Sequence, residues 1–124
     1  MQRTLKILTL FIFLLTLHAY AQEVELKDGL YYNSSGELYS GNYDVTDEQG
    51  IKTTTYTIDK GKLDGQVTFY SSTGKKIEEG LYKDGKKSGK WYKWDANDNK
   101  IAEASFKNGL KDGEWYTWDS KGTK

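Results

Sequence analysis

The sequence contains no cysteine and no proline, and its only arginine, histidine and methionine lie within the first 18 residues. Beyond that stretch, the chain can form no Ser-His or Cys-His nucleophile pair, no ordinary zinc or copper site and no disulfide. Without arginine it also has no guanidinium group for bidentate binding of carboxylates or phosphates. These absences disfavour an enzyme, and we expect a non-catalytic protein with no cofactor and no bound metal ion.

The first 21 residues have the layout of a secretory signal peptide. Two basic residues precede a mostly apolar run at residues 7–17, and Ala19-Tyr20-Ala21 supplies a small-x-small cleavage site. The run is 11 residues long, whereas a permanent membrane-spanning helix needs about 20. We therefore expect cleavage of residues 1–21 and export of residues 22–124 as one domain, periplasmic or extracellular, without stable membrane insertion.

The charge of the expected mature chain is nearly balanced. Removal of the signal peptide takes away two basic residues and leaves 16 against 18 acidic ones, a formal net charge of −2. Nucleic-acid binding usually requires a strongly basic face. We therefore expect no nucleic-acid partner.

Glycines and aromatic residues recur with a period of 24 along most of the chain. Agreement of several columns at one period indicates a repeat architecture, in which a divergent first unit acts as a cap. The columns are Gly61, Gly85 and Gly109; Gly65, Gly89 and Gly113; Val67, Trp91 and Trp115; Thr68, Tyr92 and Tyr116; Tyr70, Trp94 and Trp118; and Tyr82 and Phe106.

Each repeat unit is typical of a β-hairpin. Asp84-Gly85 and Asn108-Gly109 favour type I′ turns, which need a positive φ at both central residues. A second set of polar turns falls at residues 71–74, 95–98 and 119–122, and the segments between turns have strand length. We predict an all-β fold: an elongated, single-layer antiparallel meander of about eight strands, built from stacked hairpin repeats of about 24 residues.

Alternation along the strands assigns the aromatic columns to opposite faces of the sheet. In the intervening strands, Gly80-Leu81-Tyr82 and Ala104-Ser105-Phe106 place a small residue two positions before an aromatic one, which leaves room for a ring from a neighbouring strand. We expect the strand at residues 113–118 to be an edge strand that Glu114 and nearby lysines protect from aggregation.

The aromatic columns have two interpretations. An exposed row of rings could stack on sugars or anchor a protein partner. Alternatively, cross-strand aromatic pairs stabilise a sheet by about 0.2–1 kcal/mol each, and this structural interpretation is favoured because the columns coincide with the repeat. The candidate binding surface comprises Tyr70, Tyr92, Trp94, Tyr116 and Trp118, whereas Trp91, Trp115, Tyr82, Phe106 and the column glycines are assigned to the fold.

Three other motifs favour ordinary structural roles. Residues 80–87 resemble a phosphate-binding loop but lack the Ser or Thr after the lysine and the strand-loop-helix context. Residues 95–99 begin like a calcium loop, but its sixth and twelfth positions are Lys100 and Phe106 in place of Gly and Glu. Glu78 and Glu79 are adjacent on a strand, so their side chains point to opposite faces and cannot share a substrate.

The glycine and aromatic pattern resembles a known repeat family. The form small-x-aromatic-x-x-Gly-x-x-x-Gly-x-Trp at residues 80–91 and 104–115 resembles the MORN repeat. Its spacing is similar to that of the bacterial MORN variant in YwqK-type antitoxin-like proteins, and the likeness covers residues 38–122. The resemblance implies a twisted sheet of stacked hairpins that serves as a scaffold or binding surface, and the antitoxin label implies a toxin partner. Asp98 and Ile58 depart from the pattern.

Together these features favour an exported, non-enzymatic repeat scaffold that mediates protein-protein interaction through an aromatic sheet face. One alternative is a carbohydrate-binding module with Tyr92, Trp94, Tyr116 and Trp118 as a platform for a glycan. The other is an antitoxin or immunity-type protein that neutralises a toxin, which rests on the resemblance alone.

Overall fold

The computed structural model describes residues 23–124, so the predicted signal peptide lies outside the described residues. The described part of the chain is all-β, as predicted, and contains no helix that could cross a membrane. Its strands are β1 (Val24–Lys27), β2 (Leu30–Asn33), β3 (Gly41–Thr46), β4 (Lys52–Asp59), β5 (Lys62–Leu63), β6 (Gly65–Tyr70), β7 (Lys76–Lys83), β8 (Lys86–Trp94), β9 (Lys100–Lys107) and β10 (Leu110–Thr117).

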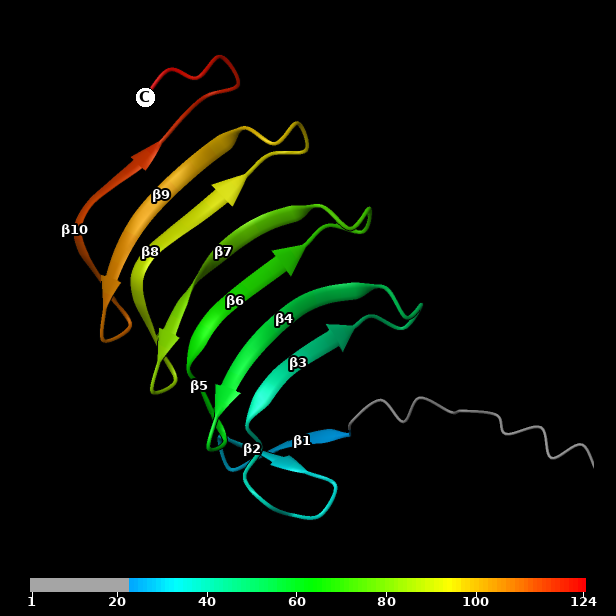
Figure 1. Ribbon diagram of the computed structural model, residues 1–124. Coiled ribbons are helices and arrows are strands. Elements are labelled where there is room, and N and C mark those ends of the chain that lie inside the picture. Colours follow the sequence, from blue (N-terminus) through cyan, green and yellow to red (C-terminus); the bar gives the residue numbers. More distant parts are fainter. Residues whose placement is uncertain (1–22) are drawn as a thin grey trace, which may run out of the picture.

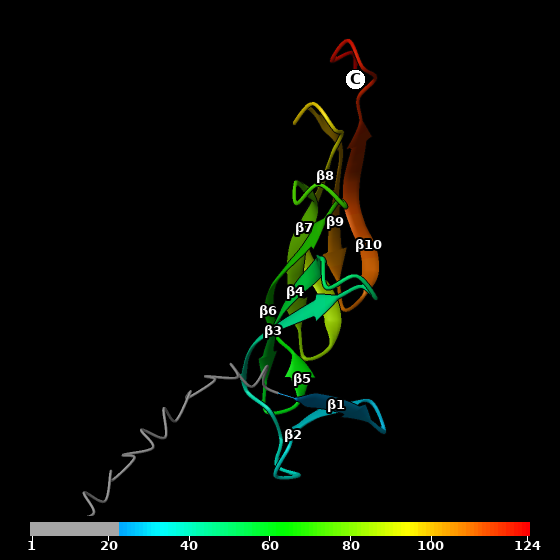
Figure 2. The same cartoon turned by 90° about the vertical axis from the view of Figure 1, so that its right-hand side faces the viewer.

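The strands from β3 to β10 form one antiparallel sheet in meander order. The sheet order is β10-β9-β8-β7-β6-β4-β3, with the short β5 paired to β4, so sequential strands lie side by side (Figure 1). Turned by 90°, the sheet is one layer thick and extended along one direction (Figure 2). The predicted elongated meander of stacked hairpins is therefore confirmed.

The first hairpin departs from a single continuous meander. β1 and β2 form a separate two-stranded sheet, and Tyr32 of β2 also makes an isolated bridge with Leu38. The backbone of β2 bonds to the turn after β4, where the Tyr31 N–H donates to the Gly61 carbonyl (2.9 Å). The Gly61 N–H in turn donates to the carbonyl of Tyr39, in the segment between β2 and β3 (2.8 Å). The first unit thus caps the end of the sheet as a separate hairpin, because its backbone groups bond to a turn instead of extending the ladder.

The type I′ turns connect successive hairpins. Asp84 and Gly85 have φ values of 49° and 80°, and Asn108 and Gly109 have 51° and 82°, so both central residues are left-handed. The Gly85 N–H donates to the Leu63 carbonyl (2.8 Å), and the Gly109 N–H donates to the Lys87 carbonyl (2.9 Å). Each turn glycine therefore bonds to a residue 22 positions earlier and ties its hairpin to the preceding one.

The opposite row of turns is built around one side-chain oxygen per repeat. The Oδ1 atom of Asp95 accepts hydrogen bonds from the N–H groups of Asn97 (2.8 Å) and Asn99 (3.0 Å). Asp47 and Asp119 accept equivalent pairs, and Ser71 Oγ accepts one such bond from the backbone, so a further 24-residue column runs through 47, 71, 95 and 119. Backbone N–H groups thus donate to the Asp95 carboxylate. Residues 95–99, which begin like a calcium loop, therefore form an ordinary polar turn.

The long strands bend, and the bends coincide with shifts in pairing register. Figure 1 shows the curvature along the strands from β4 to β10. The register shifts between Glu79 and Leu81 in the β7–β8 pair and between Lys111 and Trp115 in the β10–β9 pair. Gly113 lies within the second shift with a φ of 83°. A bulge with a left-handed glycine adds an unpaired residue and bends the strand, so the glycine column generates the curvature.

From β6 to β10 the core is one row of residues that crosses the sheet, and Ile58 of β4 and Tyr39 before β3 are buried at the other end. Val67 is opposite Gly80, and Ala104 is opposite both Trp91 and Trp115, so bulky side chains alternate with small ones from β6 to β10. A Cβ atom built on Gly80 would lie only 2.1 Å from the Trp91 indole. The indole therefore occupies the space that any side chain at position 80 would fill.

Trp91 is the best-enclosed ring of this row. Its side chain is 4% exposed, and its Nε1–H donates to the Leu81 carbonyl (3.2 Å). Tyr82 and Phe106 approach the indole edge-on, with centroid distances of 5.4 Å and 6.0 Å. Such edge-to-face pairs contribute about 0.5–1.5 kcal/mol beyond the area they bury. The single-layer sheet thus buries the Trp91 indole by packing it over Gly80 and between the rings of Tyr82 and Phe106.

Replacing Gly80 with Ala tests this packing. We expect Gly80→Ala to lower the free energy of unfolding by about 1–3 kcal/mol, because the added methyl group overlaps the Trp91 ring. In a Trp91→Leu background the same change should cost much less. Urea denaturation of the wild type, the two single variants and the double variant measures the coupling between positions 80 and 91. An equal loss of unfolding free energy from Gly80→Ala in both backgrounds would contradict the proposed contact.

Protonation of the turn carboxylates should weaken the fold. The Asn99 N–H, together with smaller contributions, holds the pKa of the Asp95 carboxyl below its usual value. A lowered folded-state pKa stabilises the fold above the ordinary carboxyl range, and this contribution is lost as the pH falls through the folded-state pKa. We expect Asp95→Asn to make the melting temperature less sensitive to pH between 5 and 3.

Asp98→Asn is the matched control, since it removes the same charge from the same turn. Asp98 faces Lys75 at 3.8 Å. Melting curves at constant ionic strength provide the comparison. If both variants flatten the pH profile equally, the backbone bonds to Asp95 are not the source of the acid sensitivity.

Candidate functional site

The sheet has two chemically different faces, which we name after adjacent residues of β8. On the Trp91 face, Trp91 lies in one row with Gly80, Ala104 and Trp115. On the Tyr92 face, Tyr92 is opposite Glu79 and Glu103. The alternation of the strands places all five residues of the predicted binding surface on the Tyr92 face: Tyr70, Tyr92, Trp94, Tyr116 and Trp118.

Lysines of the chain itself cover these five rings. All five residues are half-buried, and a lysine ammonium placed over a ring stabilises by about 0.5–1 kcal/mol at exposed sites. The distances from Nζ to the ring centroid are 5.9 Å for Lys52 and Tyr70, 4.5 Å for Lys76 and Trp94, 4.5 Å for Lys100 and Tyr92, 5.9 Å for Lys100 and Trp118, and 3.2 Å for Lys124 and Tyr116.

Glutamates complete this arrangement on the Tyr92 face. Glu103 lies 3.1 Å from Lys90 and 3.4 Å from Lys100, and Glu79 lies 2.9 Å from Lys76. The hydrogen bond from Lys90 holds the pKa of Glu103 below its usual value. The Tyr92 face therefore consists of rings, ammonium groups and carboxylates that satisfy one another, and a ligand would have to displace lysines to reach a ring.

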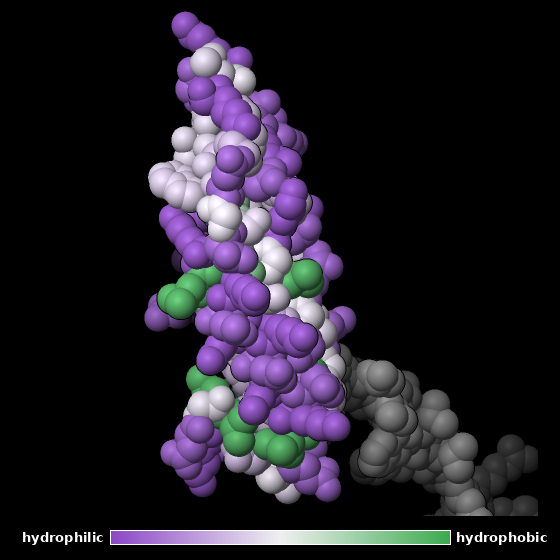
Figure 3. All heavy atoms as spheres, turned by 90° about the vertical axis from the view of Figure 1, so that its left-hand side faces the viewer, coloured by the Kyte–Doolittle hydropathy of each residue, from purple (hydrophilic) through white to green (hydrophobic). Residues whose placement is uncertain are grey.

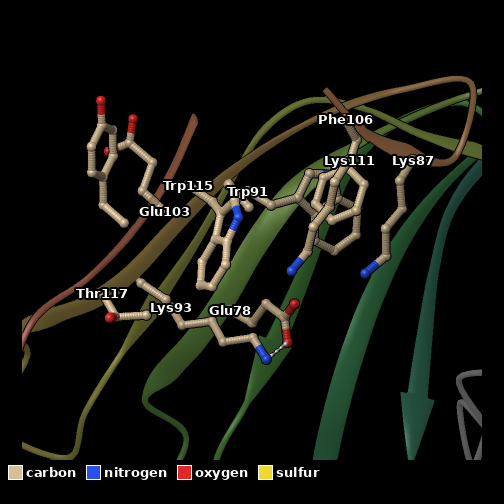
Figure 4. A pocket seen from close by; sticks show the side chains of 12 residues that line it. Glu78, Lys87, Trp91, Lys93, Glu103, Phe106, Lys111, Trp115 and Thr117 are labelled. Carbon is tan, nitrogen blue, oxygen red and sulfur yellow. Dashed lines mark ion pairs between the residues drawn. The ribbon is translucent and has the colours of Figure 1, made fainter. Parts of the chain in front are cut away.

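The Trp91 face is hollowed over the strands β7 to β10. A cleft of about 330 Å³ lies there, with Trp91, Phe106 and Trp115 supplying its aromatic surface (Figure 4). Glu78 and Lys93 form an ion pair of 3.8 Å on one side of it. The cleft thus combines aromatic surface with a charged rim.

Two further lysines border the aromatic part of the cleft. Lys87 Nζ is 4.1 Å from the Trp91 ring centroid and 5.1 Å from that of Phe106. Lys111 Nζ is 4.5 Å from the Trp115 ring centroid. Figure 4 shows the side chains of both lysines extending past the rings, with their ammonium groups on the same side. The rim is consequently rich in ammonium groups, and Glu78 and Glu103 are its carboxylates.

Trp115 differs from its repeat equivalent in exposure. Trp115 is 58% exposed, against 4% for Trp91. Trp91 has strands on both sides, which supply Tyr82 and Phe106 as neighbouring rings. In the described residues Trp115 has a neighbouring strand on one side, β9. The same residue type in the same column is therefore core in one repeat and accessible surface in the next.

Trp115 is the one aromatic residue among the exposed large hydrophobic residues of the described part of the chain. The side seen in Figure 3 is mostly hydrophilic, and its hydrophobic residues form small separate groups. Among residues 23–124, no cluster of three carboxylate, histidine or cysteine side chains could hold a metal ion. The accessible indole beside the cleft is thus the feature that best qualifies as a binding site.

The sequence pattern assigned Trp115 to the fold because it shares a column with Trp91. The signal that could have singled it out is the expected edge position of residues 113–118, since an edge strand leaves one flank of its side chains uncovered. The Asp and Ser column at 47, 71, 95 and 119 was a second regularity available from the spacing alone.

No protein-family model, curated protein or solved structure matches the chain. The resemblance to the MORN repeat therefore rests on the spacing of glycines and aromatic residues.

The two tryptophans of the column should differ sharply in their contribution to stability. We expect Trp91→Ala to lower the free energy of unfolding by about 3–5 kcal/mol, because it leaves a cavity between two rings. Trp115→Ala should cost less than about 1 kcal/mol, as is usual for exposed positions. Far-ultraviolet circular dichroism during urea denaturation measures both. Similar losses would show that Trp115 is packed as firmly as Trp91.

Proposed function

We propose that this protein is an exported, non-enzymatic β-hairpin repeat scaffold that binds another protein through the Trp91 face. The single observation that carries the proposal is the 58% exposed indole of Trp115 beside an aromatic cleft of about 330 Å³. Tryptophan is among the residues that contribute most to binding energy in protein interfaces. A charged rim around an aromatic centre is also the usual anatomy of such an interface.

The choice between the two faces follows from how each ring is already used. On the Tyr92 face the rings lie under lysines that glutamates hold in place. On the Trp91 face the Trp115 ring has one lysine near it, Lys111, and most of its surface remains exposed. Binding over Trp115 therefore buries apolar surface without breaking a network of ion pairs, which makes it the more favourable contact.

A carbohydrate is the second candidate ligand, and we place its binding site in the same cleft instead of on the Tyr92 face. Sugar rings stack on exposed indoles, and Glu78, Lys93 and Thr117 provide hydrogen-bonding groups beside Trp115. Titration of the tryptophan fluorescence with a panel of glycans separates this candidate from the first. The antitoxin-like interpretation would make the protein partner a toxin, and its support is the repeat spacing.

Affinity capture with the immobilised full chain tests the proposed surface. We expect a saturable partner that binds the wild type and the Trp118→Ala variant alike. Trp115→Ala should weaken this binding by at least tenfold, because a central interface tryptophan contributes about 2 kcal/mol or more. The two variants are matched, since each removes one indole from the same repeat on opposite faces.

Each other result has a definite meaning. Loss of binding with Trp118→Ala and not with Trp115→Ala would assign the contact to the Tyr92 face. Recovery of no saturable partner by the wild-type chain would contradict the scaffold function, and a saturable glycan response that Trp115→Ala abolishes would replace the protein partner by a carbohydrate.

A further inference from the structure

Strand β10 exposes a backbone edge next to Trp115. It pairs with β9 on one side, and no residue within 23–124 pairs with its other side. A strand of this length with open N–H and C=O groups is a template for pairing with another extended chain. The accessible indole and the open edge therefore belong to one surface, which we call the β10 edge.

The preceding repeat shows what fits such an edge. The strand β8 is the repeat equivalent of β10. Its side that corresponds to the open side of β10 is paired with β9. In that pair Trp91 is opposite Ala104 and Gly89 is opposite Phe106. The small Ala104 side chain leaves space for the indole, and the Phe106 ring lies against the indole with a centroid distance of 6.0 Å. Two residues of the covering strand thus complete the enclosure of the tryptophan.

The same interactions define an incoming strand for β10. Trp115 and Gly113 lie 24 residues after Trp91 and Gly89. A strand that covers β10 in the same register therefore needs a small residue opposite Trp115 and an aromatic residue opposite Gly113. In an antiparallel strand, the aromatic residue follows the small one by two positions, as Phe106 follows Ala104.

A charge difference adds one more requirement. In the β8–β9 pair, Lys90 forms an ion pair of 3.1 Å with Glu103, the residue before Ala104. The repeat equivalent of Lys90 in β10 is Glu114, a carboxylate that accepts a hydrogen bond from the Tyr116 hydroxyl within the same strand. A glutamate at the position of Glu103 would repel Glu114, whereas a lysine or arginine there would attract it. The incoming strand is thus specified as basic-small-x-aromatic.

We propose that the β10 edge binds an extended segment of a partner protein with the pattern basic-small-x-aromatic, which adds to the sheet as an antiparallel strand. This proposal rests on the function proposed above and specifies its partner. The backbone ladder supplies affinity, and the three side chains supply specificity, as in other cases of strand addition. Enclosure of the Trp115 indole is the main source of buried apolar surface.

The pattern favours a different protein over a second copy of this chain. The other edge strand of the sheet, β3, contains Gly41-Asn42-Tyr43, which has the small-x-aromatic order. The residue before it is Ser40 and not a basic one. The Tyr39 hydroxyl also donates to the Asn42 carbonyl (2.6 Å) and already occupies a backbone acceptor of that strand. β3 therefore lacks the charge that Glu114 requires.

Synthetic peptides provide the probe. The test peptide copies residues 100–108 of this chain with Glu103→Lys, and the reference peptide keeps Glu103. Titration of the full chain with the test peptide should give saturable binding and a blue shift of the tryptophan emission, because Trp115 becomes enclosed. The reference peptide should bind at least threefold more weakly, as expected for a charge placed against a like charge.

Two peptide controls and one protein control examine the packing. Ala104→Leu in the test peptide should weaken binding at least tenfold, because the larger side chain occupies the space of the indole. Phe106→Ala should do the same by removing the ring opposite Gly113. Trp115→Ala in the protein should remove the blue shift.

A charge exchange gives a result that loss of folding cannot imitate. The protein variant Glu114→Lys should reverse the preference and bind the reference peptide more tightly than the test peptide. Hydrogen exchange should also slow at the amides of β10 when a peptide binds. Failure of the test peptide to saturate at millimolar concentration, or an unchanged preference in Glu114→Lys, would overturn the proposal.

The results also separate this proposal from the function on which it rests. Capture of a partner that depends on Trp115, with no peptide binding, would retain the scaffold and exclude strand addition. Peptide binding without any captured protein partner would support the β10 edge and contradict the scaffold function. Concentration-dependent dimerisation that the test peptide does not reverse would show that a second copy occupies the edge, which also overturns the proposal.

Discussion

The packing of an indole over a residue with no side chain is the interaction on which this sheet depends. A single layer has no second layer to cover it, so its large side chains must be buried against its own strands. Gly80 makes this possible, because the Trp91 ring lies within 2.1 Å of where a Cβ atom would be. The neighbouring rings of Tyr82 and Phe106 then close the two flanks of the indole. The row of alternating large and small residues extends this arrangement across the sheet.

The regularities of the backbone follow from the same requirement. Left-handed glycines at positions such as 89 and 113 introduce bulges, and the resulting curvature is visible along the strands (Figure 1). The opposite face obtains its cohesion differently, from lysines that lie over rings and pair with glutamates. One face is therefore stabilised by burial of apolar surface and the other by charge and ring contacts. This division explains why Trp115, an exposed ring on the first face, is a better candidate for binding than the half-buried rings on the second face.

A repeat architecture also explains why a binding surface arises where it does. Every internal strand receives complementary side chains from both of its neighbours. β10 receives them from β9 alone among the described residues, so Trp115 keeps the exposure that Trp91 has lost. The geometry that encloses Trp91 then specifies what would enclose Trp115. The contacts that bury Trp91 inside the sheet therefore indicate which side chains a partner strand needs in order to bury Trp115.

Much of the architecture could be read from the sequence, because it depends on local chemistry repeated at a fixed spacing. Asp84-Gly85 determines a turn, and alternation along each strand assigns side chains to faces. What the sequence did not reveal was how each ring is used. Trp91 and Trp115 are the same residue in the same column, and only the presence of strands on one or both sides decides between core and surface. The lysines over the Tyr92 face, Lys52, Lys76, Lys100 and Lys124, recur every 24 residues in the sequence, but only the folded sheet places each of them over a ring. Local geometry repeats with the sequence, whereas burial depends on neighbours that only the folded sheet brings together.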